Sequence, residues 1–205
     1  RLIIAPNPSP MTHLGTNTYL LGQTQIAVID PGPDNDAHLA AILAAVAPHR
    51  VSHILVTHSH LDHSPLAKRL AALTGAKIYA FGIHLAGRSP VMADLAAQGL
   101  AGGGEGIDHG FAPDVMLKDG DCVDGHDWSL TALHTPGHIG NHLSYIWNDA
   151  VFTGDHVMGW ASSLVSPPDG DLTDFMQSCE KLQNIRARVF YAGHGAPIHD
   201  PQRRL

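Results

Sequence analysis

The chain carries its apolar residues in short runs separated by glycine, proline and polar residues, a pattern typical of strands joined by turns. In the first half, these runs alternate with stretches in which apolar residues recur every three or four positions, which predicts helices. Strands are expected at residues 2–4, 17–21, 25–29, 51–56 and 77–80. Helices are expected at about 37–47 and 64–73, capped by Asp36 and Ser64, with Pro65 in the first turn of the second.

The second half is predicted to contain a second group of strands. Residues 82–110 are irregular: Leu95 to Ala97 could be helical, but Gly99 and the run Gly102 to Gly104 cannot, so we expect a mobile excursion near a site mouth. Residues 117–121 predict a hairpin turn. Strands are expected at about 121–124, 128–133, 143–147, 151–153 and 189–191, and a helix at 172–184.

Each group of strands carries helices on its outside, which predicts two sheets packed face to face and covered by helices, a four-layer αββα sandwich of the α/β class. No internal repeat and no linker divides the sequence, so residues 1–205 are expected to form one domain. An apolar content of 44% is ordinary for a globular protein.

Charge and cysteine content narrow the functional classes. The formal net charge of −7 gives no general attraction to nucleic acid or to an anionic membrane. No apolar run approaches the ~18 residues of a membrane span. The two cysteines, Cys122 and Cys179, do not make a disulfide framework and are most simply buried thiols. We therefore expect a cytoplasmic protein without a membrane partner.

The densest chemistry lies in residues 58–63, which contain His58, His60, Asp62 and His63 directly after the apolar run 54–56. A strand that ends and releases three histidines and a carboxylate into a tight loop is suited to binding a metal ion. Imidazole and carboxylate together favour zinc, with iron or manganese as alternatives.

Three further strand-end motifs can complete the ligand set. His58 and His60 alternate along an extended loop, so they can face the same way, and His138 after the turn Pro136–Gly137 is the expected third ligand. A second metal would use Asp62 and His63 together with a carboxylate and a histidine from elsewhere. Asp155, after the apolar strand 151–153, and His194, between two glycines, are the candidates.

In order and spacing, the motifs His58-x-His60-x-Asp62-His63, Thr135-Pro136-Gly137-His138, Thr153-Gly154-Asp155 and Gly193-His194-Gly195 resemble the metallo-β-lactamase superfamily. Residues 15–20, 117–121 and 174–176 are similar to its β-lactamase-like endoribonuclease branch, and glyoxalase II is a more distant likeness. The resemblance implies the αββα fold, two zinc ions per chain and a bridging role for Asp155.

The sequence also departs from this family's patterns. Dedicated class-B lactamases generally lack an acid in the bridging position, and many use a cysteine ligand near it; here Asp155 is present and neither cysteine lies in a ligand motif. Ser64–Pro65 stands where relatives often have glycines. The endoribonuclease branch and glyoxalase II carry a C-terminal helical segment, which we expect this chain to lack after His194.

A two-metal site of this kind predicts hydrolysis by a metal-bridging hydroxide, with Asp62 orienting the hydroxide and taking up its proton. Resemblance to the endoribonuclease branch favours a phosphodiester, so the substrate would be a small molecule or a nucleic acid. The alternatives are thioester hydrolysis of the glyoxalase II type, promiscuous β-lactam hydrolysis, a non-enzymatic metal-dependent binding domain, and di-iron chemistry. In di-iron relatives a glutamate usually replaces His60, which argues for zinc here.

Several residues near these motifs are candidates for supporting roles. Asp30 and His134 could hydrogen-bond the ligands from outside, and His142 or His156 could protonate a leaving group. The alternative for Asp30 is a capping residue and that for His134 is a strand-end residue. The alternative for His142 and His156 is a packed or solvent-facing histidine.

Other residues are expected to shape the edge of the site. Thr16, Asn17 and Tyr19 match the family pattern, and Trp160 with residues 162–168 forms a candidate rim loop. The alternative is that Trp160 is an aromatic residue of a surface loop and that residues 162–168 form a turn.

Overall fold

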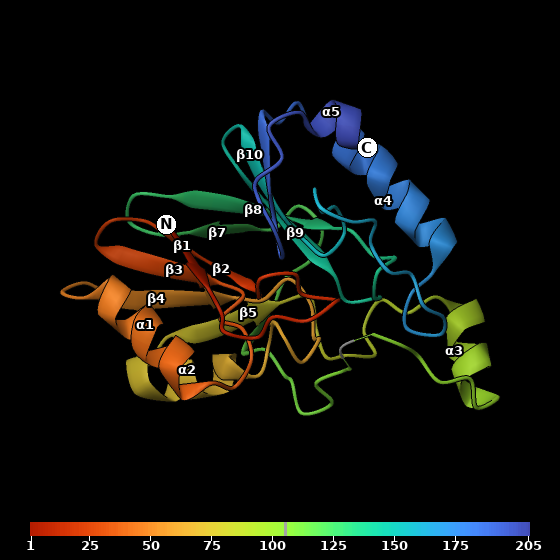
Figure 1. Cartoon of the computed structure of the whole chain (residues 1–205), viewed down its shortest axis with the longest axis horizontal. Helices are drawn as coiled ribbons and strands as arrows, with labels where there is room; N and C mark the ends of the chain where they lie inside the picture. The colour runs from red at the N-terminus through yellow and green to blue at the C-terminus, as the bar shows by residue number, and fades with distance from the viewer. Residues whose placement is uncertain (105) are drawn as a thin grey trace.

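The computed structural model describes residues 1–104 and 106–205, and in them two sheets pack face to face with helices outside (Figure 1). The first sheet contains, in spatial order, β1 (Leu2–Ile4), β2 (Asn17–Leu21), β3 (Gln25–Ile29), β4 (Arg50–Leu55), β5 (Lys77–Ala80) and β6 (Val115–Met116). The second contains, in spatial order, β11 (Val189–Ala192), β10 (Ala150–Gly154), β9 (Leu143–Trp147), β8 (Ser129–His134) and β7 (Cys122–Asp124). The predicted αββα sandwich is confirmed.

Helices cover the outer faces of both sheets. α1 (Asp36–Val46) and α2 (Leu66–Thr74) pack on the first sheet, and α4 (Leu172–Asn184) packs on the second, with α5 (Pro201–Arg204) beside it (Figure 1). α3 (Pro90–Ala97) stands apart from both sheets and buries no residue. Among the described residues, no helix has the length and apolar character needed to cross a membrane.

Strand directions place the ends of β8, β10 and β11 on one side of the second sheet. β8 and β10 are both antiparallel to β9, so they run the same way, and β11 is parallel to β10. In the first sheet β3, β4, β5 and β6 are parallel to one another, with α1 and α2 as crossovers. The loops that follow β8, β10 and β11 therefore leave the second sheet together.

The core explains the continuous apolar runs of the sequence. In β3, Ile26 and Val28 pack under the helices of the first sheet, whereas Ala27 and Ile29 face the second sheet. Successive side chains of a strand point to opposite faces, so a strand buried on both faces needs apolar residues at every position.

Two helix starts differ from the sequence prediction. Asn35, not Asp36, is the cap of α1, and its side chain accepts a hydrogen bond from His38 N at 2.9 Å. Ser64 does not cap the second helix, whose N-cap position is occupied by Pro65 without a side-chain hydrogen bond. The Ser64 hydroxyl instead donates to Asp108 Oδ2 at 2.9 Å, so it ties the preceding loop to a distant segment.

The hairpin predicted at residues 117–121 is wrong. β6 pairs with β5 in the first sheet and β7 pairs with β8 in the second, so this turn carries the chain from one sheet to the other. Asp121 Oδ2 accepts from Lys118 N at 2.7 Å. Such turn chemistry specifies a reversal of the chain but not which strand it will pair with.

The irregular region 82–110 contains more helix than predicted. Ser89 caps α3 by accepting from Met92 N at 3.3 Å, and Pro90 occupies its first turn. Because α3 buries no apolar face, no periodic pattern marks it. Glu105, in the predicted excursion, lies outside the described residues. The terminal helix α5 was not predicted either.

Candidate metal centre

The seven candidate ligands lie on four loops, each of which follows the end of a strand. The loop after β4 supplies His58, His60, Asp62 and His63, and the other ligands follow β8, β10 and β11. All seven residues are buried. The structure therefore brings together every residue that the sequence nominated as a metal ligand, from positions up to 136 residues apart in the chain.

His58, His60 and His138 form one group, here called the three-histidine cluster. His60 Nδ1 lies 3.0 Å from His58 Nε2 and 3.0 Å from His138 Nε2. Two nitrogens bound to one zinc ion at ordinary lengths are separated by roughly 3.3 Å. The three nitrogens are therefore spaced nearly as ligands of a single ion.

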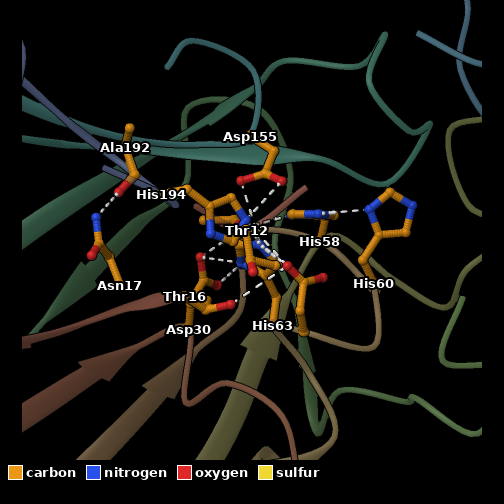
Figure 2. A network of polar contacts seen from close by, with 12 residues as sticks. Thr12, Thr16, Asn17, Asp30, His58, His60, His63, Asp155, Ala192 and His194 are labelled. Carbon is orange, nitrogen blue, oxygen red and sulfur yellow. Dashed lines mark hydrogen bonds and ion pairs between the residues drawn. The ribbon is translucent and has the colours of Figure 1, made fainter. Parts of the chain in front are cut away.

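Asp62, His63, Asp155 and His194 form the second group, here called the mixed cluster. His194 Nε2 lies 3.1 Å from Asp62 Oδ2 and 3.2 Å from Asp155 Oδ2. His63 Nε2 lies 3.3 Å from Asp62 Oδ2 and 3.4 Å from Asp155 Oδ1. Figure 2 shows Asp155, His63 and His194 converging, with His58 and His60 to one side.

Asp155 is the residue that stands between the two clusters. Its Oδ2 is also 3.8 Å from His138 Nε2 in the three-histidine cluster. Its Oδ1 is buried and, apart from the 3.4 Å ion-pair contact with His63 Nε2, has no hydrogen-bond donor within the described part of the chain. A buried carboxylate oxygen without a donor is costly unless a cation satisfies it. The donor set and this oxygen both fit a pair of divalent ions.

The protonation of His58 and His60 suits cation binding. Burial lowers the pKa of His58 well below its usual value and, with neighbouring His138, lowers the pKa of His60 to about 3. These imidazoles are therefore neutral near pH 7, as metal binding requires.

The mixed cluster balances its charges internally. Burial alone would lower the pKa values of His63 and His194. The carboxylates of Asp62 and Asp155 instead raise the pKa of His63 well above its usual value. Asp155 in particular raises the pKa of His194 to about 10. Burial would likewise raise the pKa of Asp62, but His63 and His194 hold it well below its usual range. In the protein without metal, protons occupy the positive position that a cation would take.

Asp30 supports the ligands from outside, as predicted. Its Oδ2 lies 3.0 Å from His63 Nδ1 and accepts from Thr57 Oγ1 at 2.8 Å, while its Oδ1 accepts from Thr57 N at 2.7 Å. Because the Thr57 hydroxyl hydrogen is used on Asp30, Thr57 Oγ1 must accept from His58 Nδ1, 2.9 Å away. This leaves the lone pair of His58 Nε2 for the cluster.

Two other ligands are oriented by backbone carbonyls. His138 Nδ1 donates to the carbonyl of Leu164 at 2.7 Å, and His194 Nδ1 donates to that of Gly15 at 3.3 Å. Each contact occupies the Nδ1 hydrogen, so Nε2 is the atom that would bind a cation once it carries no proton. Thr57 could have been suspected from its place beside His58, but no sequence signal marks Leu164 or Gly15, since any residue offers a carbonyl.

Glycine is required at two positions against the ligands. A Cβ atom on Gly193 would lie 2.3 Å from Asp155 Oδ1 and 2.8 Å from His63 Cε1. At Gly154, whose φ is +47°, a Cβ atom would lie 2.6 Å from His142 Nε2. Gly193 therefore makes room for two candidate ligands, and Gly154 makes room for the buried side chains of His142 and Thr57 beside them.

The prediction that His134 orients a ligand is wrong. Its ring stacks on Phe81 with centroids 3.8 Å apart, and its Nε2 lies 3.0 Å from the carbonyl of Gly140. His142 and His156 are also unsuited to protonating a leaving group, because both are buried and neither lines the cavity beside the ligands. His142 Nδ1 lies 2.9 Å from Thr135 Oγ1.

Thr16, Asn17 and Tyr19 shape the edge of the site, as expected. Asn17 Nδ2 donates to the Ala192 carbonyl at 3.0 Å (Figure 2) and to the Gly195 carbonyl at 2.8 Å, so it contacts the backbone on both sides of His194. Tyr19 donates to the Ala192 carbonyl at 2.7 Å, and Thr16 Oγ1 lies 3.5 Å from Asp62 Oδ2. These residues hold the end of β11 in position.

A cavity of about 220 Å³ lies over the clusters. Its floor contains His60, Asp62, His138 and Asp155. Of the predicted rim, Trp160 and residues 162–164 line it. The ligands thus face a space large enough for a substrate group.

Comparisons with known proteins agree with this geometry. The metallo-beta-lactamase superfamily model matches residues 11–194. The chain is 31% identical over 213 residues to an atrochrysone carboxyl ACP thioesterase from Aspergillus fumigatus, covering 99% of this chain and 58% of the relative. It is 29% identical over 211 residues to a beta-lactamase-like protein 2 homolog from Drosophila melanogaster, covering 97% and 65%.

Solved structures show the same architecture. A metallo-beta-lactamase family protein from Thermus thermophilus superposes with a TM-score of 0.80 and 25% identity, covering 100% of this chain and 76% of that one. ETHE1 from Myxococcus xanthus superposes with a TM-score of 0.72 and 22% identity, covering 100% and 81%. The chain spans 58% and 57% of the length of the first two curated relatives. With the family match over most of its length, this chain belongs to the metallo-beta-lactamase superfamily.

Proposed function

We propose that this chain is a dinuclear metal-dependent hydrolase that cleaves thioesters. The observation that carries the proposal is the position of two buried ligand clusters side by side, with Asp155 in contact with both, under an accessible cavity. All seven ligands are present, which argues against a binding domain that has lost its chemistry.

The three-histidine cluster would hold one ion and the mixed cluster the second. When bound, two divalent ions would supply an activated water at neutral pH and offset the charge that develops on the acyl oxygen. Zinc is the proposed metal, because the donors are imidazole and carboxylate in sets of three and four. Iron and manganese share these donors and are the alternatives to be measured.

Asp62 is the proposed catalytic carboxylate. It lines the cavity, and its Oδ2 is held among His63, His194 and Thr16. A carboxylate fixed at this point can orient the attacking water and receive its proton. Thioester hydrolysis then adds the hydroxyl of water to the acyl carbon, breaks the carbon–sulfur bond and leaves the proton for the departing thiol.

The thioester assignment revises the phosphodiester expectation. Curated relatives over nearly the whole chain are named as acyl-carrier-protein thioesterases. In addition, no lysine or arginine occurs among the described residues that line the cavity, so a polyanionic substrate would meet no cationic side chain there. We propose a small-molecule or carrier-bound acyl thioester as the partner, and no nucleic acid. Cys122 is exposed and Cys179 is partly exposed, so the expectation of buried thiols is wrong, but both are free and favour a reducing compartment such as the cytoplasm.

The test compares metal content and hydrolysis in one preparation. Protein purified without added metal is analysed for zinc, iron and manganese, reconstituted, and assayed with an acyl thioester, bis(p-nitrophenyl) phosphate and nitrocefin. We expect about two equivalents of metal and hydrolysis of the thioester above the other two. Less than one equivalent after reconstitution, or preference for the phosphodiester, would contradict the proposal.

The variant Asp62→Asn tests the catalytic carboxylate. It should keep the fold but lose at least about 100-fold in kcat, the usual scale of a general base. Asp149→Asn is the matched control, because Asp149 is exposed and pairs with Arg188. Near-normal turnover of Asp62→Asn would remove Asp62 from the mechanism.

A further inference from the structure

The cavity over the metal clusters has two chemically different parts. Its lining includes four candidate ligands, here called the floor, and the apolar side chains Met11, Met158, Trp160 and Leu164, here called the acyl wall. Met158 is buried, while the other three remain partly exposed at the mouth, with 36% to 38% of their surface accessible. A cluster of partly exposed apolar side chains beside a reactive floor is typical of a ligand-binding surface.

Trp160 is held in place from two sides. Its ring lies 4.9 Å from that of His13, tilted by 39°. On the other side, a Cβ atom on Gly195 would lie 2.7 Å from Trp160 Cδ1, so the indole rests on the backbone directly after the ligand His194. The position of the indole is therefore tied to the position of the ligand.

The loop that carries the rest of the wall is also anchored. The Leu164 carbonyl accepts from His138 Nδ1 at 2.7 Å, and the Met158 carbonyl accepts from Arg204 Nε at 2.6 Å. Ser163 Oγ donates to the His156 carbonyl at 2.8 Å. Because the backbone is fixed at these points, the wall is formed before substrate binds, which lowers the entropic cost of binding.

We propose that the acyl wall binds the acyl group of the thioester and selects a compact, uncharged, apolar group such as an aromatic ring. This inference rests on the proposed function and adds the substrate class to it. A cavity of about 220 Å³ has room for roughly seven water-sized groups, which matches one ring rather than a long chain. A planar ring can also stack against the indole of Trp160.

Charge disfavours acyl groups that carry a carboxylate. No lysine or arginine among the described residues lines the cavity, so the acyl wall itself offers no cationic side chain. The nearby guanidinium of Arg204 is occupied by the carbonyls of Met158 and Ala161. A succinyl group bound at the acyl wall would therefore place its free carboxylate against apolar side chains, with no cationic side chain to pair it.

The test uses N-acetylcysteamine thioesters of benzoic, acetic and succinic acid with the metal-reconstituted protein. The wild type should show a kcat/KM for the benzoyl thioester at least about tenfold above those of the other two. Trp160→Ala should lower the benzoyl value about tenfold and the acetyl value less than about threefold, whereas Trp160→Phe should retain most of the benzoyl value. Met116→Ala is the control, because Met116 is exposed and lies outside this cavity.

A binding measurement separates this inference from the proposed function. Ketone analogues, in which a methylene group replaces the thioester sulfur, are titrated while tryptophan fluorescence is followed in wild type and Trp160→Phe. Tighter binding of the phenyl ketone than of the methyl ketone, with no turnover of any thioester, would keep the acyl wall and refute thioester hydrolysis. Three results would overturn the acyl wall even if thioesters are cleaved. They are equal affinities for the phenyl and methyl ketones, equal losses of kcat/KM for the benzoyl and acetyl thioesters in Trp160→Ala, and a higher kcat/KM for the succinyl thioester.

Discussion

Replacing Asp30 by asparagine tests whether contacts outside the ligand set hold the metal centre. Asp30 is 2% exposed and accepts from Thr57 N, Thr57 Oγ1 and His63 Nδ1. Its backbone has φ of +50°, a conformation that asparagine tolerates better than alanine does. The variant Asp30→Asn therefore changes one oxygen to an amide group with little added backbone strain.

The magnitude follows from the hydrogen bonds. In the wild type, both carboxylate oxygens of Asp30 face hydrogen-bond donors. Whichever way the asparagine amide turns, its NH₂ group replaces one of these oxygens, so at least one buried donor loses its acceptor. A lost charge-assisted hydrogen bond of this kind costs roughly 1.5–3 kcal/mol. Since about 1.4 kcal/mol corresponds to a tenfold change in an equilibrium constant, metal affinity should fall by about 10- to 100-fold, as is typical for such outer contacts.

The assay is a competition titration against a chromophoric zinc chelator, with thermal unfolding of the metal-free protein measured in parallel. Asp34→Asn is the matched control, because Asp34 is exposed and pairs with Arg69; its metal affinity should stay within about twofold. Unchanged affinity in Asp30→Asn, with or without a lower unfolding temperature, would show that Asp30 supports the fold but not the metal centre.

Two further predictions concern other parts of the chain. Gly193→Ala places a Cβ atom 2.3 Å from Asp155 Oδ1, so it should destabilise the fold by about 1–3 kcal/mol and lower the metal content. The control Gly110→Ala, whose Cβ atom would lie 3.5 Å from Asp108 Oδ1, should change neither quantity. Equal metal content in the two variants would refute the steric reasoning. Burial lowers the pKa of His38 from 6.5 to about 4. Below pH 6.5 the unfolded chain therefore takes up a proton that the buried imidazole does not. The stabilisation from burying neutral His38 is complete above pH 6.5 and is lost as the pH falls towards 4. Chemical denaturation of wild type and His38→Gln across this range should show a difference on the order of 2 kcal/mol that disappears with acid, and parallel curves would contradict it.

The sequence revealed the candidate ligands because each group follows a strand end, and three of the four motifs carry a glycine or a proline beside the candidate ligand. The αββα layers were equally visible, since strands such as β3 carry unbroken apolar runs, here Ile26 to Ile29. Strand pairing was not visible at residues 117–121, because a turn does not specify its partner strand. α3 was missed because it buries no face.

His134 shows why a position near a ligand does not predict a contact with it. In β8, His134 is on the same face of the strand as Leu130 and Ala132, whose side chains lie between the two sheets. Strand alternation therefore directs its ring toward Phe81 and not toward the ligands. The carbonyls of Leu164 and Gly15 could not have been predicted at all, because their roles depend only on tertiary placement.

The two clusters cannot be energetically independent, because shared residues connect them. Asp155 lies within 3.8 Å of His138 on one side and within 3.2 Å of His194 on the other. Thr57 bonds Asp30, which holds His63, and also faces His58 Nδ1. An ion that fixes either cluster therefore orders contacts that the other ion needs, so its binding lowers the ordering cost for the second. The loop after β4 forms the common wall of both sites, and metal loading should follow a cooperative curve rather than two separate steps.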